Sequence, residues 1–163
     1  MEVAASFVAG FNGTLDSIRV ATNNGSSVDS YVLSLASSNI SGVPGAPLET
    51  FSGLAFPGPV PGIVAVTSLA HPALLAGSTY WVVITATNPV VTVGNWFGND
   101  QGISGSNECT RNIAFSLSWS CGGSTSPAFE VNASAAVPET GTLSMTFVGL
   151  AALVIRRRAS RAV

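Results

Sequence analysis

Short runs rich in β-branched and aromatic residues, punctuated by glycine and proline, fill the first 136 residues of this 163-residue chain. Turn signals recur at intervals of about 8–12 residues, and no helix of normal length is expected in this part. The pattern predicts an all-β fold, an antiparallel, jelly-roll-like β-sandwich. Strands are expected at 14–22, 31–35, 48–51, 63–69, 78–87, 90–97, 113–119 and 129–131, of which 78–87 has the strongest β propensity.

Prolines limit where these strands can lie. Residues 56–62 contain three prolines and cannot form a central strand, because proline has no N–H to donate to the ladder. Residues 42–47 are expected to be a turn-rich break, and residues 132–136 an Ala/Ser linker. Charged residues often keep edge strands from pairing with other chains. Because this chain has few of them, we expect proline to block such pairing at the sheet edges.

Charge is scarce and unevenly distributed. Only 9% of residues are charged and none is lysine. Before residue 137, Arg19 and Arg111 oppose seven carboxylates, which leaves this part with a net charge of −5. Nucleic-acid binding needs a basic surface, so this balance excludes it.

Residues 137–163 form a separate unit after the predicted 1–136 domain. An uncharged run, 142–155, precedes Arg156, Arg157 and Arg158. Such a run can enter a bilayer as a short transmembrane helix, with the arginines on the cytoplasmic side. At about 1.5 Å per residue it is ~21 Å long, shorter than a ~30 Å hydrocarbon core, which suits a transient hold. A buried core helix is disfavoured because the run has no polar face.

A five-residue motif precedes this run: Val137, Pro138, Glu139, Thr140 and Gly141. Together with the apolar run and the arginines, it resembles the PEP-CTERM sorting signal of Gram-negative bacteria, which a membrane-embedded exosortase processes. Thr140 stands where related signals usually have proline. The motif also resembles the Leu-Pro-x-Thr-Gly signal of sortases, in which a cysteine transpeptidase would cut between Thr140 and Gly141. Both resemblances imply export, through an inner-membrane intermediate, to the cell surface or extracellular matrix.

The 1–136 domain carries a second resemblance. Residues 31–35, 44–49 and 75–83, the last containing Ala-Gly-Ser-Thr-Tyr-Trp-Val-Val, resemble the choice-anchor R domain. That family carries interchangeable bacterial C-terminal anchors and has no established activity. Its members have one more strand and a signal peptide before the point where this chain starts. Residues 1–7 lack the basic and apolar parts of a signal peptide, so we expect the sequence to be N-terminally truncated.

Catalytic and metal-binding residues are few. The single histidine, His71, lies between apolar residues and a proline, and we expect a packing or surface role for it. One histidine cannot make a multi-histidine zinc site, and residues 102–106 only approximate a nucleophile elbow. Asn99, Asp100 and Glu108 frame a loop that could hold calcium, although two carboxylates are few for a cation that takes six to eight oxygens. We therefore predict no enzyme activity, metal or cofactor.

Aromatic residues suggest a binding function rather than an enzymatic one. Trp96, Phe97 and Trp119 could stack on sugar rings, with Trp96 favoured because a polar loop begins just after it. Core packing is the competing interpretation for tryptophans in strands. A carbohydrate-binding module acting on matrix exopolysaccharide is thus the alternative to a non-catalytic, exported surface or biofilm-matrix protein.

Two cysteines, Cys109 and Cys121, would suggest a disulfide in an oxidising compartment. If residues 113–119 form one straight strand, it measures about 20 Å and keeps the cysteines apart. A disulfide needs Cα atoms about 6 Å apart, so the bridge forms only if the chain turns between them. Both possibilities stay open at the level of sequence.

Overall fold

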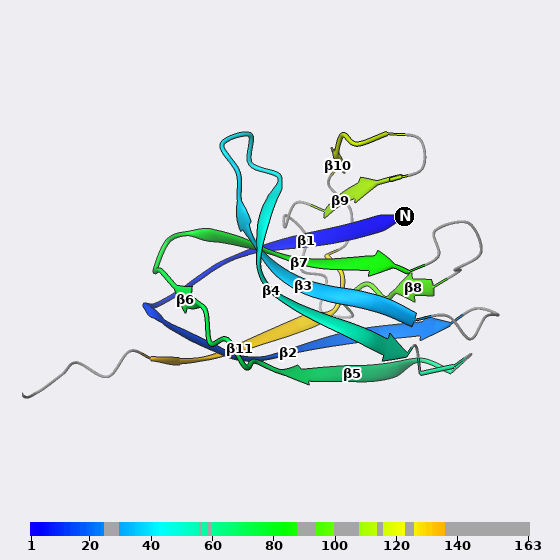
Figure 1. Ribbon diagram of the computed structural model, residues 1–163, viewed down its shortest axis with the longest axis horizontal. Coiled ribbons are helices and arrows are strands. Elements are labelled where there is room, and N and C mark those ends of the chain that lie inside the picture. The colour runs from blue at the N-terminus through cyan, green and yellow to red at the C-terminus, as the bar shows by residue number, and fades with distance from the viewer. Residues whose placement is uncertain are drawn as a thin grey trace, which may run out of the picture.

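The computed structural model describes residues 1–24, 30–55, 57–58, 60–87, 94–99, 108–113, 116–122 and 126–135. Every regular element in these ranges is a β-strand, and all strand pairings are antiparallel (Figure 1). The prediction of an all-β, antiparallel fold is therefore confirmed.

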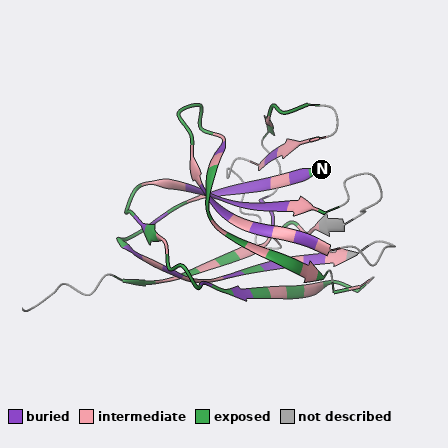
Figure 2. Cartoon of the chain, in the orientation of Figure 1, coloured by how far each residue is buried: buried purple, intermediate pink, exposed green. Residues whose placement is uncertain are grey.

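One sheet has six strands, with β1 and β7 at its centre and β10 and β4 at its edges. Their order is β10 (Ser120–Gly122), β9 (Glu108–Arg111), β1 (Glu2–Val8), β7 (Thr79–Ala86), β3 (Ser30–Ser38) and β4 (Pro44–Ala55). Figure 2 shows that buried residues dominate β1 and β7, whereas β4 is largely exposed.

The second sheet is built on the long strand β2 (Gly13–Asn24). One edge of β2 pairs with β11 (Phe129–Ala135) and β8 (Gly94–Trp96). The other edge pairs with β5 (Gly62–Thr67) and the two-residue β6 (Ala73–Leu74). This strand therefore organises the sheet, since all four partners bond to it directly.

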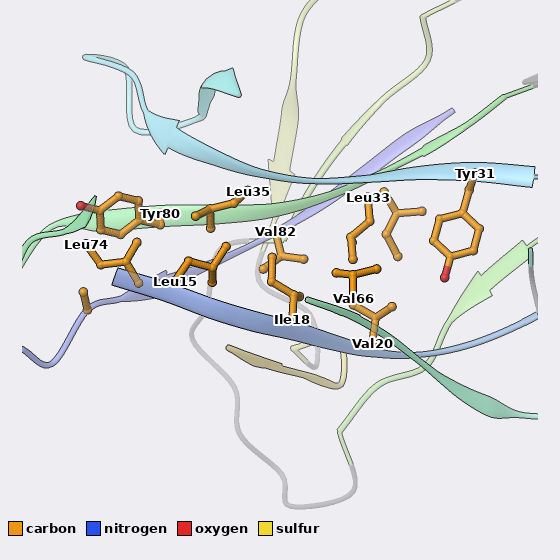
Figure 3. Close-up of a cluster of buried hydrophobic side chains, with 12 residues drawn as sticks. Leu15, Ile18, Val20, Tyr31, Leu33, Leu35, Val66, Leu74, Tyr80 and Val82 are labelled. Carbon is orange, nitrogen blue, oxygen red and sulfur yellow. The ribbon is translucent and has the colours of Figure 1, made fainter. Parts of the chain in front are cut away.

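The main core lies between the two sheets (Figure 3). Alternate residues of each strand point to the same face, so the odd-numbered apolar residues of β3 and the even-numbered ones of β7 face β2. The completely buried members include Leu15, Ile18, Val20, Tyr31, Leu33, Leu35 and Val82. Burial raises the pKa of the Tyr31 hydroxyl to about 12, and the nearby Thr22 side chain offsets part of this rise.

A smaller apolar cluster covers the opposite face of the six-stranded sheet. Trp81, on β7, is completely buried there and its Nε1 lies 3.3 Å from Ser38 Oγ, to which it donates. Ala4, Ala36 and Cys109 surround it, and Trp119 packs against the cluster. Because β7 is buried on both faces, its sequence is a continuous apolar run rather than an alternation.

Two predicted boundaries are wrong because strand pairing overrides local composition. β4 begins at Pro44, inside the predicted break, and tolerates proline because it is an edge strand with shifts in its register to β3. The predicted linker at 132–136 is also wrong for residues 132–135, which belong to β11. This strand continues along β2 past a bulge between Asn132 and Ala133.

The predicted strand at 113–119 is wrong as well. Its described residues, 113 and 116–119, belong to the connection between β9 and β10 and are not in a strand. Arg111 ends β9, and the Ser116 N–H donates to the Asn112 carbonyl, which turns the chain. Of the predicted strand at 90–97, the structure describes only the last part, in which β8 covers Gly94–Trp96.

Residues 136–163 lie outside the described part, and with them the predicted transmembrane helix at 142–155. Within the described ranges, no helix is long and apolar enough to cross a membrane.

Candidate functional site

The predicted sorting residues, 137–141 and Arg156–Arg158, lie outside the described residues. The structure does show where the chain heads toward them. Ala135, the last residue of β11, pairs with Gly13 at the start of β2. The C-terminal segment therefore leaves the sheet beside the turn that joins β1 to β2 (Figure 1).

Trp96, predicted to be the exposed member of a sugar site, is partly buried against the main core. Its Nε1 donates to the Ala128 carbonyl at 3.0 Å, and its ring meets Phe129 edge-on with centroids 6.0 Å apart. The neighbouring Phe97 is held by its backbone, which bonds Ala21 and Ala128. These contacts give Trp96 a packing role.

Trp119 lies in a different environment. It packs against the smaller apolar cluster around Trp81, here called the outer cluster. The Arg111 guanidinium carbon is 4.5 Å from the centroid of the Trp119 ring, a cation–π contact. The six-stranded sheet separates the two clusters to which Trp96 and Trp119 belong. The structure therefore does not bring the predicted aromatic trio together.

Arg111 and Glu2 form an ion pair next to Trp119. The two residues are register partners on β9 and β1, and Glu2 also accepts from Thr85 Oγ1 at 3.0 Å. Arg19 forms the other ion pair, with Glu130 at 3.0 Å across β2 and β11. Thus both arginines of the described part are paired. No sequence signal identifies these partners, which are more than a hundred residues away.

Cys109 and Cys121 are joined by a disulfide. They are register partners on the antiparallel strands β9 and β10, with Cα atoms 4.0 Å apart. The bridge is possible because the chain reverses between them instead of running straight, so the geometric obstacle inferred from the sequence does not exist.

The described part does not assemble the calcium ligands considered above. Asn99 uses both its backbone N–H and its Nδ2 to bond the Ser126 carbonyl, at 2.9 and 2.7 Å. Asp100 lies outside the described residues. Among the residues that are described, no group of three or more His, Cys, Asp or Glu side chains could hold a metal ion.

A Glu–Ser–His network, which the sequence did not suggest, joins the sheets near β4 and β5. Glu49 accepts from Ser68 Oγ at 2.5 Å and from the N–H groups of Leu69 and Ala70 at 2.7 and 3.0 Å. His71 has a left-handed backbone, with φ of 46°, and its N–H donates to Ser68 Oγ.

The hydrogen bonds of this network do not pair Ser68 with His71 as a nucleophile and its base. Ser68 is 1% exposed and donates its proton to the carboxylate, not to an imidazole. His71 Nδ1 lies 3.0 Å from the Leu15 carbonyl, so Nδ1 carries the proton. Serine and histidine therefore lack the nucleophile–base bond that acyl-transfer catalysis requires. His71 itself is exposed, which agrees with the surface role among the two that were predicted for it.

Glu49 should make folding stability sensitive to acid. Burial alone would raise the pKa of its carboxyl group, but the hydrogen bonds from Ser68, Ala70 and Leu69 and the nearby His71 bring it below 4.5. A carboxylate with a lowered folded-state pKa stabilises the protein above the unfolded-state pKa and loses that contribution as pH falls through the folded-state value.

We therefore expect Glu49→Gln to lower the free energy of unfolding by about 1–2 kcal/mol at pH 7, because charge-assisted hydrogen bonds are lost. The variant's stability should also fall less steeply than the wild type's below pH 4.5. Urea denaturation at several pH values measures both effects. Glu130→Gln, which breaks a half-exposed ion pair, is the control and should cost under about 1 kcal/mol. Equal costs for the two variants would contradict this role for Glu49.

A shallow depression of about 210 Å³ lies beside the second half of β2, where β5 and β11 begin. Arg19, Ile63 and Glu130 border it, and the arginine and glutamate neutralise one another. Ligand sites usually combine an enclosed apolar surface with several convergent polar groups, which this depression lacks.

Comparison with protein-family models, with curated proteins and with solved structures finds no match to this chain. The resemblances to the two kinds of sorting signal and to the choice-anchor R domain therefore rest on the quoted motifs and stay predictions.

Proposed function

We propose that this chain is a non-catalytic protein of the cell surface or extracellular matrix, exported and delivered through its C-terminal sorting signal. The observation that carries the proposal is the order of motif, uncharged run and arginines in residues 137–163. The motif begins two residues after β11 ends, so the sheets and the signal are separated by almost no linker.

The proposed mechanism is a transient hold in the membrane. Residues 142–155 partition into the bilayer as a short helix, and Arg156, Arg157 and Arg158 stay on the cytoplasmic side. This places residues 137–141 at the outer face, where an exosortase-type or sortase-like enzyme processes them. The jelly-roll-like sandwich before the motif is then the exported body.

One property of the described part supports an extracellular location, and another supports a rigid exported body. The disulfide between Cys109 and Cys121 is of a kind that persists in oxidising compartments. The apolar contacts of both sheets and the two ion pairs suit a rigid body rather than a flexible carrier. The carbohydrate-binding alternative is less well supported, because Trp96 and Trp119 belong to clusters on opposite faces of one sheet.

Replacing Arg156, Arg157 and Arg158 with alanine should abolish retention and processing. The expected result is an unprocessed chain in place of one that ends near Thr140 on the cell surface. Intact-mass analysis of surface and inner-membrane fractions from the native host measures this. Arg19→Ala, which removes one arginine outside the signal, should be processed normally. Normal processing of the triple variant would refute the membrane-hold mechanism.

A second substitution separates the two enzyme classes. Thr140→Pro creates the commonest exosortase-type motif and removes the threonine whose carbonyl the cysteine of a sortase would attack, with release of the Gly141 amine. Under our proposal processing persists in this variant. Loss of processing in Thr140→Pro, with processing intact in the wild type, would assign the signal to a sortase-like transpeptidase.

A further inference from the structure

Three apolar side chains are exposed at the end of the molecule where β1 turns into β2. Val8, the last residue of β1, is 64% exposed, Phe11 in the following turn 48%, and Leu75 just after β6 58%. We call these three residues the exit-end patch. Exposed apolar groups that gather at one place mark interaction surfaces more often than scattered ones do.

Hydrogen bonds hold the two turns of the patch together. The N–H of Ala9 donates to the Ser78 carbonyl at 3.0 Å, and the N–H of Gly77 donates to the Ala9 carbonyl at 2.8 Å. The Ala76 N–H bonds Asn12 Oδ1 at 2.8 Å. These polar groups are already satisfied within the protein, so contact with an apolar phase would not leave them unpaired.

The two turns that form this end are uncharged, and the carboxylate closest to them in sequence on β2, Asp16, accepts a hydrogen bond from Ser134 on β11. No charged residue occurs from position 3 to 15 or from 72 to 87. Because desolvating a charge is the largest cost of contact with a lipid phase, these segments meet that phase at low cost. Their lack of charge also argues against a strongly charged partner protein.

The C-terminal segment leaves from the same end. Ala135 pairs with Gly13, and Leu74 pairs with Gly13 on the other edge of β2. The Phe11 ring lies so close to Gly13 that a Cβ added there would be 2.9 Å from it. Six residues, 136–141, separate Ala135 from the apolar run, and a chain of that length spans at most about 20 Å.

We propose that the exit-end patch rests on the surface of the lipid bilayer while residues 142–155 are held in it. This inference rests on the proposed function, since the tether is what brings the patch to the bilayer. Three side chains alone would bind a membrane weakly. A short tether makes their contact intramolecular, and the effective concentration then reaches the millimolar range. The contact would orient the body with β11 toward the membrane and hold residues 137–141 at its surface.

Single tryptophan reporters in the full-length chain test the contact. Phe11→Trp and Leu75→Trp place a reporter in the patch. Ile63→Trp is the matched control, because Ile63 is 61% exposed and pairs with Ala21, about 25 Å from Gly13 along β2. Each variant is incorporated into vesicles of phosphatidylcholine and phosphatidylglycerol, with or without bromine on the acyl chains near the headgroups. The unsubstituted protein gives the background of the native tryptophans.

Brominated lipid should quench the added emission of both patch reporters by roughly half, because aromatic rings at the interface lie close to the upper acyl chains. The Ile63→Trp emission should not change. Val8→Ser combined with Leu75→Ser should reduce the quenching of Phe11→Trp. Equal quenching at all three positions, or none, in vesicle-bound protein would overturn the proposal.

Two other outcomes are distinguishable. If the patch reporters are already blue-shifted without lipid and brominated lipid adds no quenching, residues 142–155 or a second copy of the chain cover the patch, and the bilayer contact is refuted. If the protein does not float with the vesicles, the membrane hold itself fails, and the inference that rests on it falls with it.

Discussion

Replacing Trp81 with alanine is expected to lower the free energy of unfolding by about 3–5 kcal/mol, the range for large-to-small changes in a packed core. Trp81 is completely buried on the outer face of the six-stranded sheet, in contact with the cluster that includes Ala4, Ala36 and Cys109. Small neighbours cannot expand to fill the vacated volume. The substitution also removes the donor to Ser38 Oγ.

Urea denaturation followed by circular dichroism measures this effect. The slope of the unfolding free energy against urea concentration should be the same in the variant as in the wild type. Trp119→Ala is the matched control. It removes the same side chain from a partly exposed position on the same cluster and should cost distinctly less. If Trp81→Ala and Trp119→Ala cost the same, the outer cluster is not a core of the kind described here.

Removing the disulfide, by substituting alanine for both Cys109 and Cys121, is expected to cost about 2–4 kcal/mol. The bridge closes a short loop, with a sequence separation of 12 between its cysteines, and fixes β10 and β9 at the edge of the sheet. Without it, the unfolded chain gains conformational freedom, and the edge strands lose their covalent connection. The midpoint of urea denaturation measures the loss.

Reduction provides an independent check on the disulfide. A phosphine reductant should lower the stability of the wild type to nearly that of the double variant and leave the double variant unchanged. Hydrogen exchange should increase first in β9 and β10, with β2 and β7 still protected. If the reductant does not affect the wild type, the bridge contributes nothing to stability.

The sequence analysis located β2, β3 and β7 well but predicted no strand for β1, although β1 lies at the centre of the six-stranded sheet. The segments predicted at 14–22, 31–35 and 78–87 became β2, β3 and β7. Their side chains pack on at least one buried face, so each carries a local pattern of apolar residues. The edge strands β4 and β11 are longer than the predicted strands at 48–51 and 129–131. Backbone pairing with β3 and β2 holds their additional residues in the sheet, and such pairing leaves little trace in amino-acid composition.

The predicted functional residues divide in the same way. The proposed sorting signal is a local pattern, since its motif, apolar run and arginines follow one another in linear order along the chain. The aromatic site depended on distant residues being brought together, and the structure instead places Trp96 and Trp119 in separate clusters. Aromatic side chains form a surface for sugar stacking only if they lie on the same face of the protein, and their spacing along the chain does not specify this.

Hydrophobic alternation and turn chemistry by themselves predicted the antiparallel strands of the described part, and charge composition led us to expect no nucleic-acid surface. Only the tertiary structure decided that Cys109 meets Cys121, that Glu2 pairs with Arg111, and that Glu49 holds the turn at Ser68. The first group of properties depends on neighbours within about ten residues. The second depends on register across strands far apart in the chain, where a shift of one residue would turn each partner to the other face of the sheet.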